Sequence, residues 1–438
     1  MKTIFFLYLI SIWCVKVQAQ NQLTGSTKTE VINNLCQSLL DNYVFEDTAI
    51  DMKNSLLKNL ANGLYDSITN PQEFAQRLTT DVRNVYDDKH LSIIFDPKML
   101  ENLADTSKLK QEEQRKENRV AYAQENFGFK KVEILNSNIG YMYFNRFYGF
   151  NEDSKERVNT VFSFLKYANA LIIDVRNNGG GSPDMDKYIS SFLLQPKTQL
   201  SSFYERRNDS TELNYTYQPD IPVSFALKPI YILVNRLTFS AAETFAYDLQ
   251  HLHRATIIGE TTGGGAHAVQ STNISNGFFG LIPYARAINP VTKTNWEATG
   301  VKPDVNALPD NAVDAATLMY YDYEIANLKD SNKIKKIQWA RTMLDAKIHP
   351  YEIDTTILKN YTGKFGDEIF SYNAGALYVK GKKSRGSPSR LIPLSQTSFK
   401  QMDIDYYKFE FVKNAKGEIS GVVITYDDGY TRTDQKEE

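Results

Sequence analysis

Apolar residues recur every three or four positions through the first part of the chain, which is the spacing of helices that bury one face. Thr27 and Glu30 stand three positions apart, as in a capping box, and predict the start of one helix. Asn70 followed by Pro71 predicts a second start, with Asn as the cap and Pro at the first helical position. We therefore expect an N-terminal helical domain over residues 20–95.

The pattern of residue types changes twice after this domain. Residues 96–130 are rich in charge and poor in large apolar side chains, which predicts a charged connector or a solvated helix. From 131 to 310, short apolar runs alternate with helical periodicity, which is typical of an α/β domain. The expected strands in this core are 140–144, 170–175, 230–234 and 255–258.

The C-terminal part is different again. Residues 311–350 keep a helical pattern, whereas residues 351–438 alternate aromatic and polar side chains between turn signals. One such signal is the Asp-Asp-Gly turn at 427–429. This pattern predicts an antiparallel β module as a separate domain.

The composition is that of a globular protein, with 42% hydrophobic and 23% charged residues. Fifty Lys and Arg against 52 Asp and Glu leave a formal charge of -2. No basic field indicates nucleic-acid binding, and no acidic excess indicates a solvating tail.

The first residues have the pattern of a secretory signal. Lys2 precedes an apolar run from Ile4 to Val15, and small or tolerated residues follow it. The run is too short to span a bilayer, which needs about twenty residues. We expect a signal peptide at 1–19 and a periplasmic or extracellular mature chain without a membrane span. Bulky Trp13 argues against lipid anchoring at Cys14.

Cys36 would then be the only cysteine of the mature chain. A lone cysteine forms no internal disulfide and no thiolate metal site. Its place in an apolar helical stripe with Leu35 and Leu39 predicts a buried thiol. We therefore expect stability to come from packing.

Two strand-to-helix junctions carry candidate chemistry, because α/β proteins place their sites at the carboxyl ends of strands. Strand 230–234 leads into Ser240, which is either an exposed nucleophile or, with Glu243 three residues on, a helix cap. Strand 170–175 leads into a run of three glycines at 179–181. The amides of that run could hold an oxyanion or a phosphate, or form a plain turn, but the dinucleotide pattern G-x-G-x-x-G is absent.

A serine nucleophile needs a base. The five histidines are His90, His251, His253, His267 and His349. His251 and His253 lie two apart on an expected helix and face different ways, which makes a poor metal pair. We expect no metal site and no cofactor. His90 and His267 remain as candidate bases, and spacing alone does not choose between them.

Three ordered blocks over residues 85–305 resemble the tail-specific, C-terminal-processing serine peptidases. They are Asp174-Val175-Arg176-Asn177-Asn178-Gly179-Gly180-Gly181, Thr238-Phe239-Ser240-Ala241-Ala242-Glu243 and Gly259-Glu260-Thr261-Thr262-Gly263. The resemblance implies an α/β serine peptidase core at 131–310 with a crotonase-like spiral of ββα units. It also implies protein or peptide substrates.

The resemblance further implies which side chains serve as nucleophile and base. One branch of the family has a lysine base just after the third block, where this chain has Gly265. The branch of the tricorn core and the interphotoreceptor retinoid-binding protein uses Ser, His and Glu. By that likeness Ser240 is the nucleophile, His90 the base and Glu297 its supporting carboxylate. Lys89 departs from the tricorn pattern, which has a serine there.

The same resemblance assigns the oxyanion donors to the amide of Ala241 and that of Gly179 or Gly180. His267 stays open as the rival base. A carboxylate beside the base should raise its pKa, so the activity should rise through an ionisation near or above neutrality.

Three alternatives compete with the peptidase. The first is a non-catalytic protein that binds an apolar ligand, such as a retinoid or lipid, or a peptide on the same scaffold. A crotonase-like acyl-CoA enzyme is disfavoured by the export signal. A surface protein that acts through its β module is the third.

Overall fold

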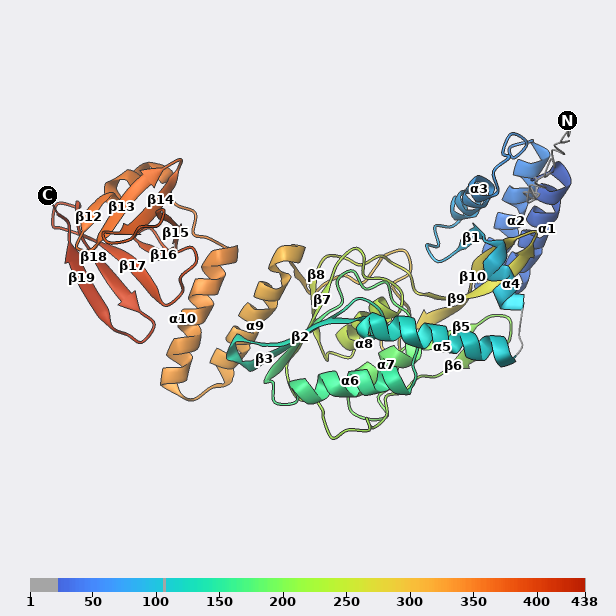
Figure 1. Cartoon of the computed structure of the whole chain (residues 1–438), viewed down its shortest axis with the longest axis horizontal. Helices are drawn as coiled ribbons and strands as arrows, with labels where there is room; N and C mark the ends of the chain where they lie inside the picture. Colours follow the sequence, from blue (N-terminus) through green and yellow to red (C-terminus); the bar gives the residue numbers. More distant parts are fainter. Residues whose placement is uncertain (1–22, 105–107, 438) are drawn as a thin grey trace, which may run out of the picture. The chain divides into compact units, whose positions relative to one another are not determined.

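The computed structural model describes residues 23–104 and 108–437 (Figure 1). The chain forms two compact units. The described part of the first unit is drawn from three stretches of sequence, namely residues up to 120, 201–213 and 265–298. The second unit comprises 121–200, 214–264 and the remainder from 299. The predicted signal peptide at 1–19 lies outside the described residues.

Three helices open the first unit: α1 (Gly25–Asn42), α2 (Glu46–Ala61) and α3 (Pro71–Arg83). The predicted start of α1 at Thr27 is wrong. Thr24 is the cap, because its hydroxyl accepts the Thr27 amide at 3.2 Å and so supplies the contact that was expected of Thr27 itself. The start of α3 is as predicted, with Asn70 Oδ1 accepting the Glu73 amide at 2.9 Å.

A five-stranded antiparallel sheet completes the first unit. Its strands are β1 (Ser92–Phe95), β5 (Ser202–Glu205), β6 (Ser210–Glu212), β9 (His267–Ser275) and β10 (Phe278–Ile288). The long β10 pairs with β9, β1 and β5, and β6 pairs with β5. Helix α4 (Pro97–Ala104) follows β1, and α4 and α5 (Lys108–Gln124) both lie in the segment predicted as a charged connector.

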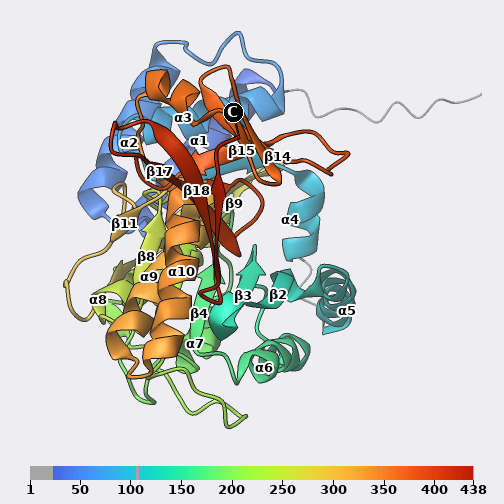
Figure 2. The ribbon, with the colours of Figure 1, turned by 90° about the vertical axis from the view of Figure 1, so that its left-hand side faces the viewer.

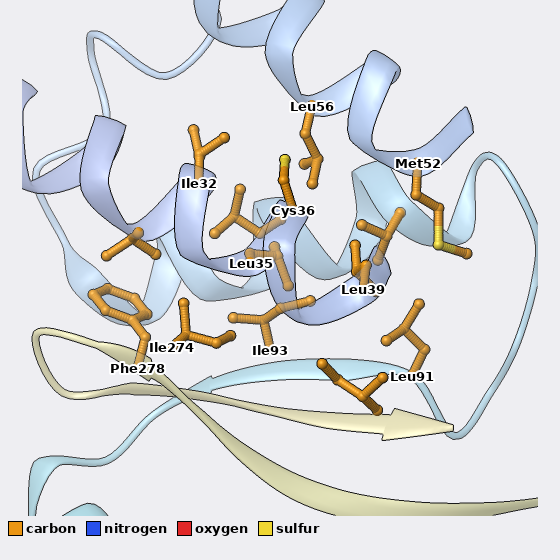
Figure 3. Close-up of a cluster of buried hydrophobic side chains, with 14 of the residues drawn as sticks. Ile32, Leu35, Cys36, Leu39, Met52, Leu56, Leu91, Ile93, Ile274 and Phe278 are labelled. Atoms are coloured by element: carbon orange, nitrogen blue, oxygen red, sulfur yellow. The ribbon is translucent and has the colours of Figure 1, made fainter. Parts of the chain in front are cut away.

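The helices bury their apolar faces against this sheet (Figure 3). Leu35 and Leu39 of α1 are fully buried with Ile93 of β1 and Phe278 of β10. Cys36 lies in the same cluster, and burial raises the pKa of its thiol to about 11. The prediction of a buried thiol is therefore confirmed.

The second unit is built on a six-stranded sheet in the order β11-β8-β7-β4-β3-β2. Its strands are β2 (Phe129–Leu135), β3 (Ile139–Phe144), β4 (Ala170–Asp174), β7 (Ile230–Val234), β8 (Thr256–Gly259) and β11 (Val305–Asn306). All neighbours are parallel except β2 and β3. The four core strands expected from the sequence correspond to β3, β4, β7 and β8.

Helices cover both faces of this sheet. One face packs on α9 (Ala312–Asn327) and α10 (Ser331–Ile348), as Figure 2 shows. Alternate residues of the strands, including Ile173 and Ile232, are equally buried on the other face. The helices there are α6 (Glu152–Leu165), α7 (Pro183–Ser191) and α8 (Ala241–His251). Because both faces are covered, the strands read as continuous apolar runs.

The C-terminal residues form the antiparallel β module that was predicted. Its eight strands pair in sequence order: β12 (Gly363–Phe365), β13 (Glu368–Asn373), β14 (Ala376–Gly381), β15 (Ser389–Pro393), β16 (Ser398–Gln401), β17 (Tyr407–Lys413), β18 (Ile419–Tyr426) and β19 (Thr431–Gln435). A bridge from Phe365 to Lys436 brings the end of the chain beside the first strand.

The chain is thus a mixed α/β protein with an antiparallel β module. Among the described residues, every helix is either too short or too polar to cross a membrane.

Candidate active site

Ser240 stands in a strained turn between β7 and α8. Its backbone has φ +56° and ψ −124°, a combination that residues other than glycine rarely adopt. A serine on a sharp strand-to-helix turn of this kind presents its hydroxyl above the end of the sheet. Strain of this kind clusters at functional sites.

Glu243 fixes this turn from inside the protein. Its side chain is fully buried, and Oε2 accepts the Ser240 amide at 2.9 Å. Oε1 accepts the Thr262 hydroxyl and, at 2.7 Å, the Gly264 amide. One carboxylate therefore holds the serine turn and the third sequence block together.

The glycine loop after β4 lies directly against the serine turn. The Phe239 amide donates to the Asn178 carbonyl at 2.9 Å. A Cβ atom on Gly180 would lie 2.7 Å from the Phe239 carbonyl oxygen and 2.8 Å from the Ala241 nitrogen. The position therefore requires glycine both for space and for its φ of +86°.

The amides of the two loops are differently engaged. The Gly180 amide donates to Asn178 Oδ1 at 2.9 Å. Within the described part of the chain, the amides of Gly179 and Ala241 donate to no protein acceptor. These two amides are therefore the ones available to a developing negative charge.

The other predicted residues, His90, His267 and Glu297, belong to the first unit. His90 immediately precedes the β1 region, His267 is the first residue of β9, and Glu297 follows β10. The structure brings them together around Asp88, a carboxylate that the sequence did not single out.

Asp88 and His267 form a buried pair. His267 Nδ1 lies 2.7 Å from Asp88 Oδ2 and 3.6 Å from Glu297 Oε2, and the three side chains are 1%, 0% and 6% exposed. A carboxylate can only accept, so Nδ1 carries the proton that it donates to Asp88. Nε2 of His267 is buried and has no hydrogen-bond partner among the described residues.

Asp88 makes two further contacts. Tyr43 donates its hydroxyl to Oδ2 at 3.1 Å, and the His90 amide donates to Oδ1 at 3.0 Å. Burial, together with the negative charge of Asp88, raises the pKa of the Tyr43 hydroxyl well above its usual value. Glu297 is held separately, since its Oε2 accepts the Ala266 amide at 2.6 Å.

Burial and charge oppose each other in this cluster. Burial lowers the pKa of His90 from 6.5 to about 4, against the opposing charge of Asp88. Burial acts to raise the pKa of Asp88, but the hydrogen bond and charge of His267 outweigh it and hold that pKa below its usual value. At neutral pH, His90 is therefore neutral and Asp88 is ionised.

The same cluster has ligand atoms for a cation. Asp88, His90 and Glu297 each offer one nitrogen or oxygen atom, and these atoms lie within 4.8 Å of one another. The sequence prediction of no metal site was drawn from the pair His251 and His253 and did not consider this group.

Sequence reasoning missed Asp88 and the anchoring role of Glu243. A signal existed for each. Asp88 stands two residues before His90, the spacing at which an Asp side chain accepts a following amide. Glu243 was considered only as the partner in a helix cap, whereas its full burial shows that it is an internal anchor.

Two family models match the chain. Residues 138–307 match the model of peptidase family S41. Residues 23–135 match the N-terminal domain of that family as it occurs in eukaryotic IRBP. The two matches together contain the serine turn, the glycine loop and the Asp88–His90 segment.

Named relatives match over shorter stretches. A tail-specific protease of Haemophilus influenzae is 29% identical over 150 residues, which are 34% of this chain and 20% of the relative. A chloroplastic carboxyl-terminal-processing peptidase 2 of Arabidopsis thaliana is 29% identical over 158 residues, 35% of this chain and 30% of the relative. The match therefore spans between a fifth and three tenths of the length of these relatives.

Among solved structures, the photosystem II D1 C-terminal processing protease superposes with a TM-score of 0.44 and 15% identity. The superposition covers 65% of this chain and 94% of that one.

Proposed function

Because the chain belongs to peptidase family S41, we propose that it hydrolyses peptide bonds of proteins or peptides with Ser240 as the nucleophile. The observation that carries the proposal is the strained Ser240 turn with the amides of Gly179 and Ala241 beside it. A helix cap needs neither a positive φ nor a second loop held against it. Such an arrangement suits a nucleophile beside an oxyanion site.

In the proposed reaction, neutral His90 accepts the Ser240 proton as the hydroxyl oxygen attacks the peptide carbonyl carbon. The carbonyl oxygen becomes an oxyanion, which the amides of Gly179 and Ala241 stabilise. A single donor of this kind is typically worth about 3 kcal/mol. The leaving amine takes the proton from His90, and water then hydrolyses the acyl-enzyme.

Glu297 is proposed to support the imidazolium that forms on His90. Its carboxylate shares the first-unit cluster with both histidines. Support for a histidine base comes from Gly265, which stands where the lysine-dependent branch has its base. In this proposal Gly180 supplies space, since its own amide is taken by Asn178.

Several finer predictions accompany this proposal. They are export to the periplasm or the exterior by a signal peptide at 1–19, a crotonase-like spiral as the core topology, and the six-segment division of the chain. Binding of an apolar ligand without catalysis is the alternative function, and it requires no reactive serine.

A fluorophosphonate probe separates the two functions, because it labels only activated serines. We expect the wild-type protein to be labelled and to cleave an unstructured peptide, and the Ser240→Ala protein to do neither. Ser182→Ala is the matched control, since Ser182 also caps a helix after a core strand and accepts the Met185 amide at 3.4 Å.

Ser182→Ala should lose about 1 kcal/mol of stability through the lost cap. Labelling of Ser240→Ala at the wild-type rate would remove Ser240 from the chemistry.

A further inference from the structure

We infer that Asp88 is a positioning residue, which holds the His90 turn directly and orients His267 beside Glu297. The inference rests on the proposed function, but all four residues lie within the first unit and their contacts can be tested without catalysis.

The two oxygens of Asp88 have different tasks. Oδ1 accepts the His90 amide at 3.0 Å and so fixes the turn from which the His90 side chain projects. Oδ2 accepts the proton of His267 Nδ1 at 2.7 Å. A single rigid carboxylate therefore fixes the position of one histidine relative to the other.

His267 continues the connection to Glu297. Its Nδ1 is 3.6 Å from Glu297 Oε2, and its ring makes a T-shaped contact with Phe45, with the centroids 5.5 Å apart. The ring is thus held both by a carboxylate and by an aromatic side chain. Hydrogen bonds connect the His90 backbone through Asp88 to His267, and Glu297 Oε2 lies 3.6 Å from the same ring nitrogen of His267.

Burial makes this arrangement costly to lose. Asp88 has no exposed surface and His267 has almost none, so water cannot replace a broken contact. Asparagine at 88 keeps one accepting oxygen, so it cannot serve the His267 proton and the His90 amide together, and at least one of the two contacts is lost. A displacement of about 1 Å in a catalytic group can cost about 100-fold in rate.

The chain offers a matched control in Asp81. This carboxylate is also buried in the first unit, where it accepts a hydroxyl from Tyr65 at 2.7 Å, as Asp88 does from Tyr43. Its other partner is Arg77 and no histidine. Asp88→Asn and Asp81→Asn therefore remove comparable buried charges, of which only one lies against the candidate site.

We expect Asp88→Asn to lower kcat about 100-fold with little change in KM, and Asp81→Asn to leave both constants within about threefold. Thermal unfolding of the two variants checks that both are folded. Equal kcat losses in the two variants would reduce Asp88 to a structural residue.

Substitutions at 267 separate positioning from base catalysis. In His267→Asn, the nitrogen of the side-chain amide lies near the position of Nδ1 and can still donate to Asp88. His267→Ala leaves no side-chain donor at this position. We expect His267→Asn to keep kcat within about tenfold of the wild type and His267→Ala to lose about 100-fold. If His267→Asn is as inactive as His267→Ala, the ring itself is required and the inference is overturned.

A measurement without catalysis keeps the inference distinct from the proposed function. In ¹⁵N-histidine-labelled Ser240→Ala protein, the His267 Nδ1 proton should give a low-field NMR signal. That signal should survive Asp81→Ala and disappear in Asp88→Ala, which leaves no accepting oxygen at this position. Its survival in Asp88→Ala refutes the pairing, whereas a wild-type protein without peptidase activity refutes only the function.

Discussion

Burial of His90 changes the pH at which a base at this position would work. Its pKa is lowered from 6.5 to about 4, because desolvation of the charged ring outweighs the attraction of Asp88. Only the neutral ring accepts a proton from serine. We therefore expect kcat/KM to rise with pH through an ionisation near 4 and to be level above about pH 6.

A pH series of peptide hydrolysis checks this prediction. The expectation from sequence, an ionisation near or above neutrality, considered the charge of a carboxylate and not the burial that outweighs it. An observed ionisation above pH 6.5 would contradict buried His90 as the base.

The lowered pKa of His90 also makes the free energy of unfolding depend on pH in the acid range. Between pH 6.5 and about 4, residue 90 is protonated in the unfolded chain and neutral in the folded one, so the unfolded state binds more protons. This contribution to stability is present above pH 6.5 and falls by up to about 3 kcal/mol as the pH drops to 4.

Denaturant unfolding of Ser240→Ala protein at several pH values measures this loss without self-cleavage. Adding His90→Asn should flatten the pH dependence. Adding His349→Asn, at a histidine whose side chain is 73% exposed, should not. Identical slopes in the two double variants would exclude His90 as the source.

At the scale of elements, the glycine loop and the serine turn pack against each other, so a side chain added to one displaces the other. Gly180→Ala would place a methyl group 2.8 Å from the Ala241 nitrogen in addition to straining φ at +86°. Gly375 in the β13–β14 turn has a similar φ of +81°, but nothing lies within 4 Å of its Cβ position. Both substitutions should cost about 1–2 kcal/mol in backbone strain.

Only Gly180→Ala should also abolish fluorophosphonate labelling, because the methyl group fills the space beside the oxyanion donor. Labelling rates and melting temperatures of the two variants test this. Equal labelling would mean that the space beside Ala241 is not used in the reaction.

The four central strands of the second unit could be predicted because each carries a local signal, whereas β2 and β11 were not predicted. The strand ending at Asp174 is an unbroken apolar run, and Ser182 with Pro183 marks the helix after it. The Ser240 turn could be located from sequence, but its strain could not, since φ there is imposed by Glu243 and the glycine loop. The contacts of Asp88 join residues 179 positions apart, and no periodicity reports them.

At the scale of the whole molecule, the β module has a core of its own. Its buried cluster includes Leu358, Phe365 and Ile424 and draws on no residue before Ile353. We expect a fragment of residues 350–438 to unfold cooperatively on heating, as monitored by near-UV circular dichroism. A broad, non-cooperative change would show that it depends on contacts with the preceding helix α10, such as those of Lys400 with the Met343 carbonyl and of Trp339 with the Asp405 carbonyl.

The predicted boundaries of the other segments stay a prediction. Nothing in the hydrophobic pattern indicates that residues 201–213 and 265–298 fold with the N-terminal helices. The pattern identifies β9 and β10 only as apolar stretches, because pairing partners are chosen by complementarity across the chain and not by local periodicity.

This assembly has a consequence for the order of events during synthesis. Ser92 pairs with Leu281, so the sheet that covers the N-terminal helices forms only after strands far along the chain have been synthesised. At roughly 5–20 residues per second, a ribosome needs about 7 to 30 s to synthesise the stretch between residues 120 and 265. During that time the apolar faces of α1 and α3 have no sheet to cover them. The nascent chain is then open to aggregation and to binding by chaperones, until the β9–β10 hairpin is complete.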